Sequence, residues 1–372
     1  MKSLLTPIRS AAAIVVIAAA CSPRESRSTA TPDSTAGAPG AAATEQAGEA
    51  DSVRASANES TRLDVTVDPR LPAYTRVDSV SGVIRSIGSD TMNNLMALWT
   101  EDFKAFYPNV QVEIEGQGSS TAPPALIQGT ANFGPMSRPM RGNEVDEFRQ
   151  VFGYEPTLMP TAVDMLALFV HKDNPIEGLT VEQVDAIFSK GRRGGYDFDI
   201  VRWGDLGLTG EWADKTISLY GRNSASGTYG FFKSNAIFGG DFKDSVKEQP
   251  GSSAVVSGIA KDRFAIGYSG IGYKTADVRV VPLMYEGDEQ FFPGEPRHAY
   301  SGAYPLARFL IVYMNYEPGT ELDPLRREFV RFLYSRDGQA DIVEDGYLPL
   351  PAVVARDAAA KVGVRVELLD AE

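Results

Sequence analysis

The chain has 372 residues, a net charge of −13, two histidines and one cysteine. Its acidic balance and its lack of a basic cluster argue against a nucleic-acid partner. A single cysteine excludes an internal disulfide and argues against a cysteine nucleophile or a cysteine-based metal site.

Residues 1–20 are predicted to be an export signal. Lys2 and Arg9 form a basic segment, and the small apolar run that follows is too short to cross a bilayer as a helix. The segment Ala18-Ala19-Ala20-Cys21 resembles a bacterial lipobox, in which the cysteine is lipidated and the signal removed, although Ala18 stands where leucine is usual. A plain secretory peptide with a chance cysteine is the alternative.

Residues 21–76 are predicted to form a disordered tether. Most of this segment is Ala, Ser, Thr, Gly, Pro and Glu, which bury too little apolar surface to fold. The remaining body of roughly 300 residues exceeds the usual size of one core, so two domains are expected.

Strands and helices alternate along the body. The apolar spacing predicts helices at 92–106, 181–189, 228–238, 254–260 and from Pro324, and strands at 110–114, 131–134, 165–170, 216–220, 264–268 and 307–314. The aromatic residues Trp99, Phe103 and Phe106 are interpreted as core. This alternation indicates an α/β protein with mostly parallel sheets.

Three Gly- and Ser/Thr-rich turns each follow a predicted strand and open a helix. They are residues 87–91, 116–121 and 221–228. A helix N-terminus has unpaired N–H donors and a partial positive charge, and Ser and Thr add hydroxyl donors. Arg222, inside the third turn, carries a guanidinium whose donors match phosphate. Together the turns predict a site for a small oxyanion.

The order and spacing of these motifs resemble the phosphate-binding proteins of bacterial high-affinity phosphate ABC transporters. The likeness covers nearly all of 79–351, and its most specific part is the Arg-x-x-x-Ser-Gly-Thr spacing from Arg222 to Thr228. It implies the type II periplasmic-binding-protein fold, with two lobes, two crossing hinge strands and the ligand in the interlobe cleft. Lobe I would comprise residues 77–168 and 306–372, and lobe II residues 169–305. The apolar runs at 165–170 and 307–314 fit the two crossings.

The resemblance also implies which residues bind phosphate. They are Ser89, Asp90, Thr91, Ser119, Ser137 and Arg138 of lobe I, and Arg222, Ser226, Gly227 and Thr228 of lobe II. The best-known members of the family have an aspartate at the position of Ser137, where it accepts the proton of bound phosphate. Asp90 is a candidate to replace that acceptor. No cofactor or metal is implied, and the expected protein is an extracytoplasmic, lipid-anchored receptor that delivers phosphate to an ABC permease.

Other interpretations of the same residues stay open at this point. The Ser and Asp residues of the first two turns could be ordinary helix N-caps. Arg222 could be a surface residue or form an interlobe ion pair, and Arg138 could form a structural salt bridge. His171 and His298 lack a metal-ligand spacing. A serine-dependent phosphatase or esterase is disfavoured because neither histidine accompanies a turn. A scaffold lipoprotein without a ligand is the remaining alternative.

Overall fold

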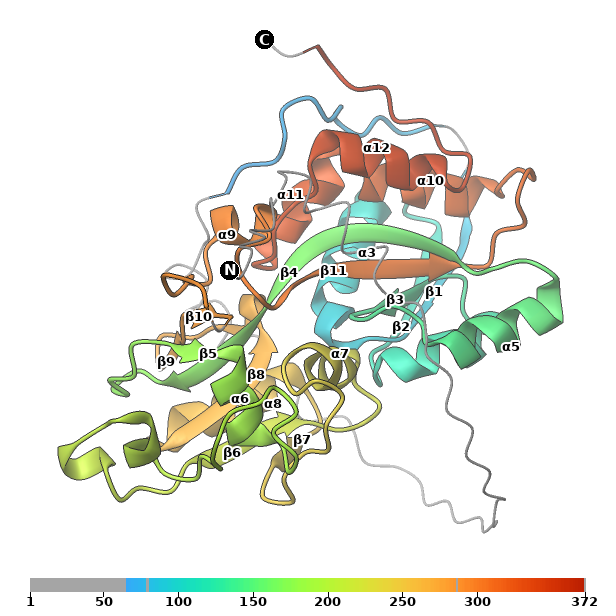
Figure 1. The fold of residues 1–372 in the computed structure, drawn as a ribbon. Helices are drawn as coiled ribbons and strands as arrows, with labels where there is room; N and C mark the ends of the chain where they lie inside the picture. The colour runs from blue at the N-terminus through green and yellow to red at the C-terminus, as the bar shows by residue number, and fades with distance from the viewer. Residues whose placement is uncertain (1–64, 78–79, 286, 371–372) are drawn as a thin grey trace, which may run out of the picture.

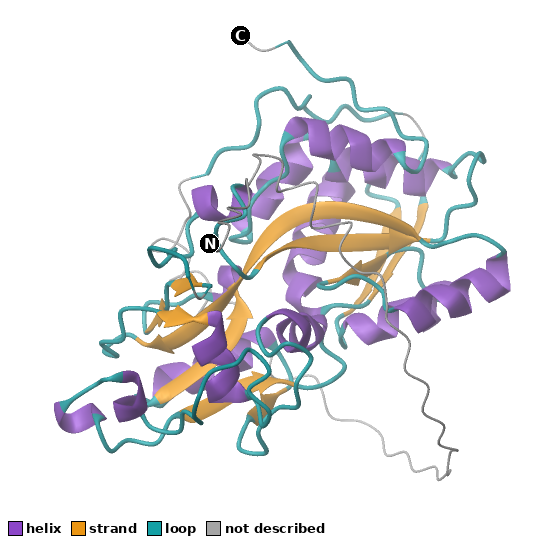
Figure 2. Ribbon diagram, viewed as in Figure 1, coloured by secondary structure: helices purple, strands orange, loops and turns teal. Residues whose placement is uncertain are grey.

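The computed structural model describes residues 65–77, 80–285 and 287–370. The predicted signal peptide and Cys21 lie outside this range. Helices flank a mixed sheet and the chain forms two groups of elements (Figures 1 and 2). We keep the predicted division into lobe I (77–168 and 306–372) and lobe II (169–305). In the described part, no helix has the length and apolar character needed to cross a bilayer.

Lobe I carries both terminal parts of the body. Its elements are β1 (Gly82–Ile87), η1 (Asp90–Met92), α3 (Asn93–Phe106), β2 (Val110–Glu115), η2 (Ser119–Thr121), α4 (Ala122–Ile127), β3 (Gly134–Met136), α5 (Gly142–Phe152), most of β4 (Thr157–His171), β11 (Ala307–Met314), α10 (Pro324–Leu333), α11 (Arg336–Glu344) and α12 (Ala352–Ala360). The predicted start of α10 is confirmed, because Asp323 Oδ1 accepts the N–H of Arg326 at 3.0 Å and Pro324 occupies the first turn.

Lobe II is the middle of the chain. Its elements are β5 (Leu179–Thr180), α6 (Val181–Phe188), η3 (Trp203–Leu206), η4 (Gly210–Trp212), β6 (Ser218–Arg222), α7 (Gly227–Asn235), β7 (Lys247–Gln249), α8 (Ser252–Lys261), β8 (Ala265–Gly270), η5 (Ile271–Tyr273), β9 (Val278–Val280), β10 (Leu283–Met284) and α9 (Pro296–Tyr300). β6 and β8 are parallel neighbours, so the loops after them open on the same edge of the sheet.

One long strand joins the two lobes. β4 pairs with β11 as far as Met165, and from Leu166 onward it pairs with β8 and β9 (Figure 1). The predicted strand at 165–170 is therefore only the end of a longer one. β11 lies beside the first half of β4, and the return connection is marked by the bond from the Leu166 N–H to the Leu306 carbonyl at 2.9 Å.

The expectation of mostly parallel sheets is wrong for the central sheet. β4 is antiparallel to β11, β8 and β9, and β11 is antiparallel to β3. Among the named strands of the described residues, the parallel pairs are β1 with β2, β5 with β10, and β6 with β7 and β8. The reason is topological: the chain leaves lobe I along β4 and returns along β11, and adjacent strands that run outward and back are antiparallel.

The interior of lobe I is rich in aromatic rings, as predicted. Trp99 and Phe103 of α3 are fully buried, and Phe106 is half-buried beside them. Phe103 meets Phe329 of α10 edge to face, with ring centroids 5.2 Å apart. This packing fixes α3, whose N-terminal end carries the first predicted turn.

The predicted tether is too long at its C-terminal end. Residues 65–76 belong to the folded body, because Leu71 is fully buried and Tyr74 is nearly so. The Asp68 carboxylate accepts the N–H of Ala352 at the start of α12, at 3.0 Å. The two apolar side chains outweigh the polar composition that suggested a tether here.

Candidate functional site

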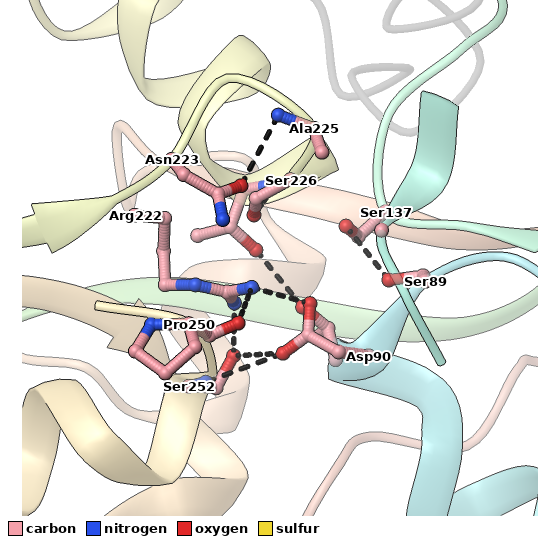
Figure 3. Close-up of polar contacts among 12 residues, drawn as sticks. Ser89, Asp90, Ser137, Arg222, Asn223, Ala225, Ser226, Pro250 and Ser252 are labelled. Carbon is pink, nitrogen blue, oxygen red and sulfur yellow. Dashed lines mark hydrogen bonds and ion pairs between the residues drawn. The ribbon is translucent and has the colours of Figure 1, made fainter. Parts of the chain in front are cut away.

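Three serine hydroxyls of lobe I meet in a buried cluster. Ser89 follows β1, Ser119 begins η2 and Ser137 follows β3, and all three are essentially inaccessible to water. Ser89 Oγ donates to Ser137 Oγ at 3.1 Å (Figure 3). The hydroxyl oxygens of Ser119 and Ser137 lie 3.3 Å apart. The Ser137 N–H donates to Ser119 Oγ at 3.0 Å. Residues from two predicted turns and from the end of β3 thus converge.

The N-terminal end of α7 in lobe II lies directly against this cluster. A Cβ atom on Gly227 would lie 2.2 Å from Ser119 Oγ and 2.5 Å from Ser137 Oγ, so only glycine permits the approach. Ser226 is the N-cap of α7, with its hydroxyl accepting the Thr228 N–H at 3.1 Å. The hydroxyl oxygens of Thr228 and Thr91 are 3.0 Å apart. The structure therefore brings the predicted residues of both lobes together.

Arg222 ends β6 with its side chain buried, at 2% exposure. Its Nη2 donates to Asp90 Oδ1 at 2.7 Å and to the Pro250 carbonyl at 3.0 Å, and its Nη1 donates to Ser252 Oγ at 2.8 Å (Figure 3). The interlobe ion pair that the sequence left open for Arg222 is thus present. Its contact with phosphate remains a prediction.

Asp90 accepts donors of the opposite lobe rather than donors of its own helix. Its Oδ2 accepts the N–H of Ser252 at 3.2 Å and the Ser252 hydroxyl at 3.3 Å. Because Ser252 is the first residue of α8, the carboxylate lies where the helix carries partial positive charge. Ser89 precedes η1 without a side-chain capping bond. The structure therefore does not support the alternative that Ser89 and Asp90 are ordinary helix N-caps.

Arg138 forms the structural salt bridge that the sequence also left open. Its Nη1 and Nη2 donate to the two carboxylate oxygens of Glu144, each at 2.7 Å. Burial by itself raises the pKa of Glu144, but the bonds from Arg138 and from the Arg141 N–H outweigh it, so that pKa lies below its ordinary value. Arg138 Nε is buried without a partner in the described residues. Arg138 is thus committed to Glu144, and a ligand role for it stays a prediction.

A family model for the PBP superfamily domain matches residues 36–337. The phosphate-binding protein PstS of Pseudomonas aeruginosa is 53% identical over 298 residues, which is 80% of this chain and 92% of that protein. The chain belongs to the family of bacterial phosphate-binding proteins. The resemblance indicated by the sequence motifs is confirmed.

Solved structures agree on the fold of this phosphate-binding-protein family member. A phosphate ABC transporter substrate-binding protein from Clostridium perfringens gives a TM-score of 0.61 at 24% identity, covering 73% of this chain and 100% of that one. A phosphate transport receptor from Vibrio cholerae gives 0.55 at 24% identity, covering 72% of this chain and 100% of that one. The predicted two-lobe periplasmic-binding-protein fold is confirmed.

Two polar elements of the site were missed by the sequence reasoning. Arg308 of β11 and Asp164 of β4 form a buried ion pair beside Ser137 and Thr228. Ser252 begins a further helix that faces the site. The sequence contains a pattern for each of them. Arg308 and Asp164 are lone charges within apolar runs, and Gly251-Ser252-Ser253 is another Gly/Ser turn that opens a helix.

The two histidines and two surface hollows lie away from these residues. His171 Nδ1 accepts the Asp173 N–H at 3.2 Å, and His298 Nδ1 lies 3.0 Å from the Pro293 carbonyl. Hollows of about 290 and about 560 Å³ share no residue with the serine cluster. Within the residues that the structure describes, no group of three or more His, Cys, Asp or Glu side chains could hold a metal ion. The candidate site combines hydroxyls, helix N-termini and arginines with the carboxylates of Asp90 and Asp164.

Proposed function

We propose that this protein is an extracytoplasmic, lipid-anchored receptor that binds inorganic phosphate between its lobes and delivers it to an ABC permease. The observation that carries the proposal is the meeting of Ser89, Ser119 and Ser137 of lobe I with Gly227 of lobe II, beside the buried Arg222. Sequence similarity to the phosphate-binding proteins of Pseudomonas aeruginosa and Bacillus subtilis supports this proposal.

The chemistry of these groups suits a tetrahedral oxyanion. Phosphate offers many acceptor lone pairs, and the site supplies hydroxyl, guanidinium and backbone N–H donors from both lobes. A hydrogen bond to a charged group contributes about 1.5–3 kcal/mol net, so several together exceed the roughly 8 kcal/mol of micromolar binding even after association entropy. Closure around the anion excludes water and strengthens each bond. Ligand binding and lobe closure would then be one event, which the permease could recognise.

Calorimetry on the purified protein with phosphate, sulfate and glucose tests the binding step. We expect saturable phosphate binding, weaker sulfate binding and none for glucose. A chromogenic phosphate ester is included as the control for the hydrolase alternative, and we expect no turnover. Failure to bind phosphate, or release of chromophore, would overturn the proposal.

The lipid anchor is tested separately. Cys21 is the lipidation site that the sequence predicts, and it lies outside the described residues. We expect wild-type protein to stay in the membrane fraction after a carbonate wash and Cys21→Ser to be released from it. A Cys21→Ser protein that remains membrane-bound would show that anchoring does not depend on lipidation.

A further inference from the structure

Arg308 of β11 and Asp164 of β4 form an ion pair next to the point where β4 passes from one lobe into the other. They are register partners in the antiparallel pairing of β11 with β4, and their side chains are 2% and 0% exposed. Arg308 Nε and Nη2 donate to the same oxygen, Asp164 Oδ2, at 2.9 and 2.8 Å. A charge this deeply buried needs such a partner. The pair therefore holds the guanidinium in one orientation.

Two further donors of Arg308 reach residues of the candidate site. Nη1 donates to the Ser137 carbonyl at 2.8 Å, and Nη2 donates to Thr228 Oγ1 at 3.0 Å. The ring of Phe231, one turn further along α7, lies 5.2 Å from the guanidinium carbon. Arg308 thus contacts the serine cluster of lobe I and the first turn of α7 in lobe II.

The bond to Thr228 determines what the threonine hydroxyl can do. A hydroxyl has one proton and two acceptor lone pairs. Because Arg308 donates into one lone pair, the Thr228 proton must point away from the guanidinium, and Thr91 Oγ1, 3.0 Å away, either accepts that proton or donates into the second lone pair. An ionised phosphate oxygen can only accept hydrogen bonds, so a hydroxyl held with its proton outward is already oriented to donate to it.

We propose that Arg308 is a positioning residue of the oxyanion site, acting through the hydroxyl of Thr228, with Asp164 holding Arg308 in place and balancing its charge. This inference rests on the proposed function, because it assigns Arg308 to the phosphate site. In this arrangement Arg222 is the cation that attracts the anion, whereas Arg308 orients a neutral donor for it.

A double-mutant cycle with inorganic phosphate, measured by calorimetry, tests this role. We expect Arg308→Gln and Thr228→Val each to weaken binding about tenfold or more, by loss of a donor to a charged ligand. In the Thr228→Val background, Arg308→Gln should change the affinity by less than about twofold, because the hydroxyl that it orients is already gone. Thr228→Ser keeps a hydroxyl at the same position and should retain most of the affinity.

Arg308→Gln leaves Asp164 as an unpaired buried charge, so the variant could unfold. The same cycle is therefore also run with Arg308→Gln combined with Asp164→Asn, which removes both charges, and thermal melting without phosphate verifies folding. Additive losses, or unchanged affinity in both the Arg308→Gln protein and this combined variant, would overturn the positioning role while leaving phosphate binding intact. Wild-type protein that binds no phosphate would overturn both this inference and the proposed function.

Discussion

At the scale of single residues, the ion pair between Arg222 and Asp90 links the two lobes. Their side chains are 2% and 15% exposed, and the carboxylate also accepts two hydrogen bonds from Ser252 of lobe II. Removal of one member of such a buried pair leaves the other charge uncompensated. The pair therefore favours contact between the lobes, in addition to any role of Arg222 toward the ligand.

Substitution of each partner separates these two roles of Arg222. If Arg222 also binds phosphate, Arg222→Ala should weaken binding by more than about 2 kcal/mol. Asp90→Asn breaks the same ion pair but keeps the guanidinium, so its effect should be clearly smaller. Arg222→Lys should recover only part of the loss, because an ammonium cannot bind bidentately. Equal losses in Arg222→Ala and Asp90→Asn, measured by calorimetry, would limit Arg222 to the interlobe link.

The ratio of phosphate to sulfate affinity tests the other role suggested for Asp90. A carboxylate that accepts the proton of bound phosphate would repel sulfate, and Asp90→Asn would then improve sulfate binding selectively. In the structure, both Asp90 oxygens already accept bonds from Arg222 or Ser252. We therefore expect the ratio at pH 7 to stay nearly unchanged in Asp90→Asn. A ratio that falls by tenfold or more would identify Asp90 as the proton acceptor.

At the scale of elements, the close approach of α7 to the serine cluster depends on Gly227. A methyl group there would overlap the hydroxyls of Ser119 and Ser137, which belong to the other lobe. We expect Gly227→Ala to abolish measurable phosphate binding while lowering the melting temperature little, because lobe II can fold without that contact. Gly142→Ala is the matched control: it also lies in the first turn of a helix, and its added Cβ would meet no atom within 4 Å. Phosphate binding retained by Gly227→Ala would place the ligand elsewhere.

The packing of α11 on α3 should make stability depend on pH. Burial, together with the neighbouring carboxylates of Asp102, Glu344 and Asp337, raises the pKa of Asp341 on α11 from 3.8 to about 8. Between these values the folded state keeps a proton that the unfolded chain has released. The contribution of Asp341 to the free energy of unfolding is therefore greatest below about pH 4, and it is lost as the pH rises toward about 8.

Thermal melting without phosphate checks this dependence. Asp341→Asn places an uncharged side chain at the site at every pH. Between about pH 5 and pH 9, its melting temperature should fall less than that of the wild type. Asp357→Asn, at an exposed position of α12, should follow the wild-type curve. Parallel curves for wild type and Asp341→Asn would contradict the raised pKa.

At the scale of the whole molecule, the segment before β1 is part of the body that the anchor would hold. Leu71 and Tyr74 are buried against lobe I, and the Pro72 carbonyl accepts the Arg336 N–H at 2.8 Å. A protein beginning at Val65 should keep full phosphate affinity and stability. A protein beginning at Val77 should lose about 3 kcal/mol of unfolding free energy or more, from the lost apolar burial. Equal denaturant midpoints for the two proteins would show that the segment contributes nothing.

The sequence by itself determined the local chemistry of this protein. The glycines and hydroxyls of the turns at 87–91, 116–121 and 221–228 indicated helix starts suited to an anion, because capping and turn formation depend on neighbouring residues. The order of these motifs also indicated the family and, through it, the two-lobe fold. The buried aromatic face of α3 followed from helical spacing, which is likewise a local property.

Only the tertiary structure decided which charges pair and how the central strands run. Arg222 is 132 positions from Asp90 along the chain, and Arg308 is 144 positions from Asp164. Such partners are chosen by the approach of separate elements, and no local pattern encodes that approach. The same holds for the antiparallel pairing of β4 with β11, which follows from the path of the chain between lobes. Residue types therefore indicated an anion site, while the fold determined which donors and counter-charges surround it.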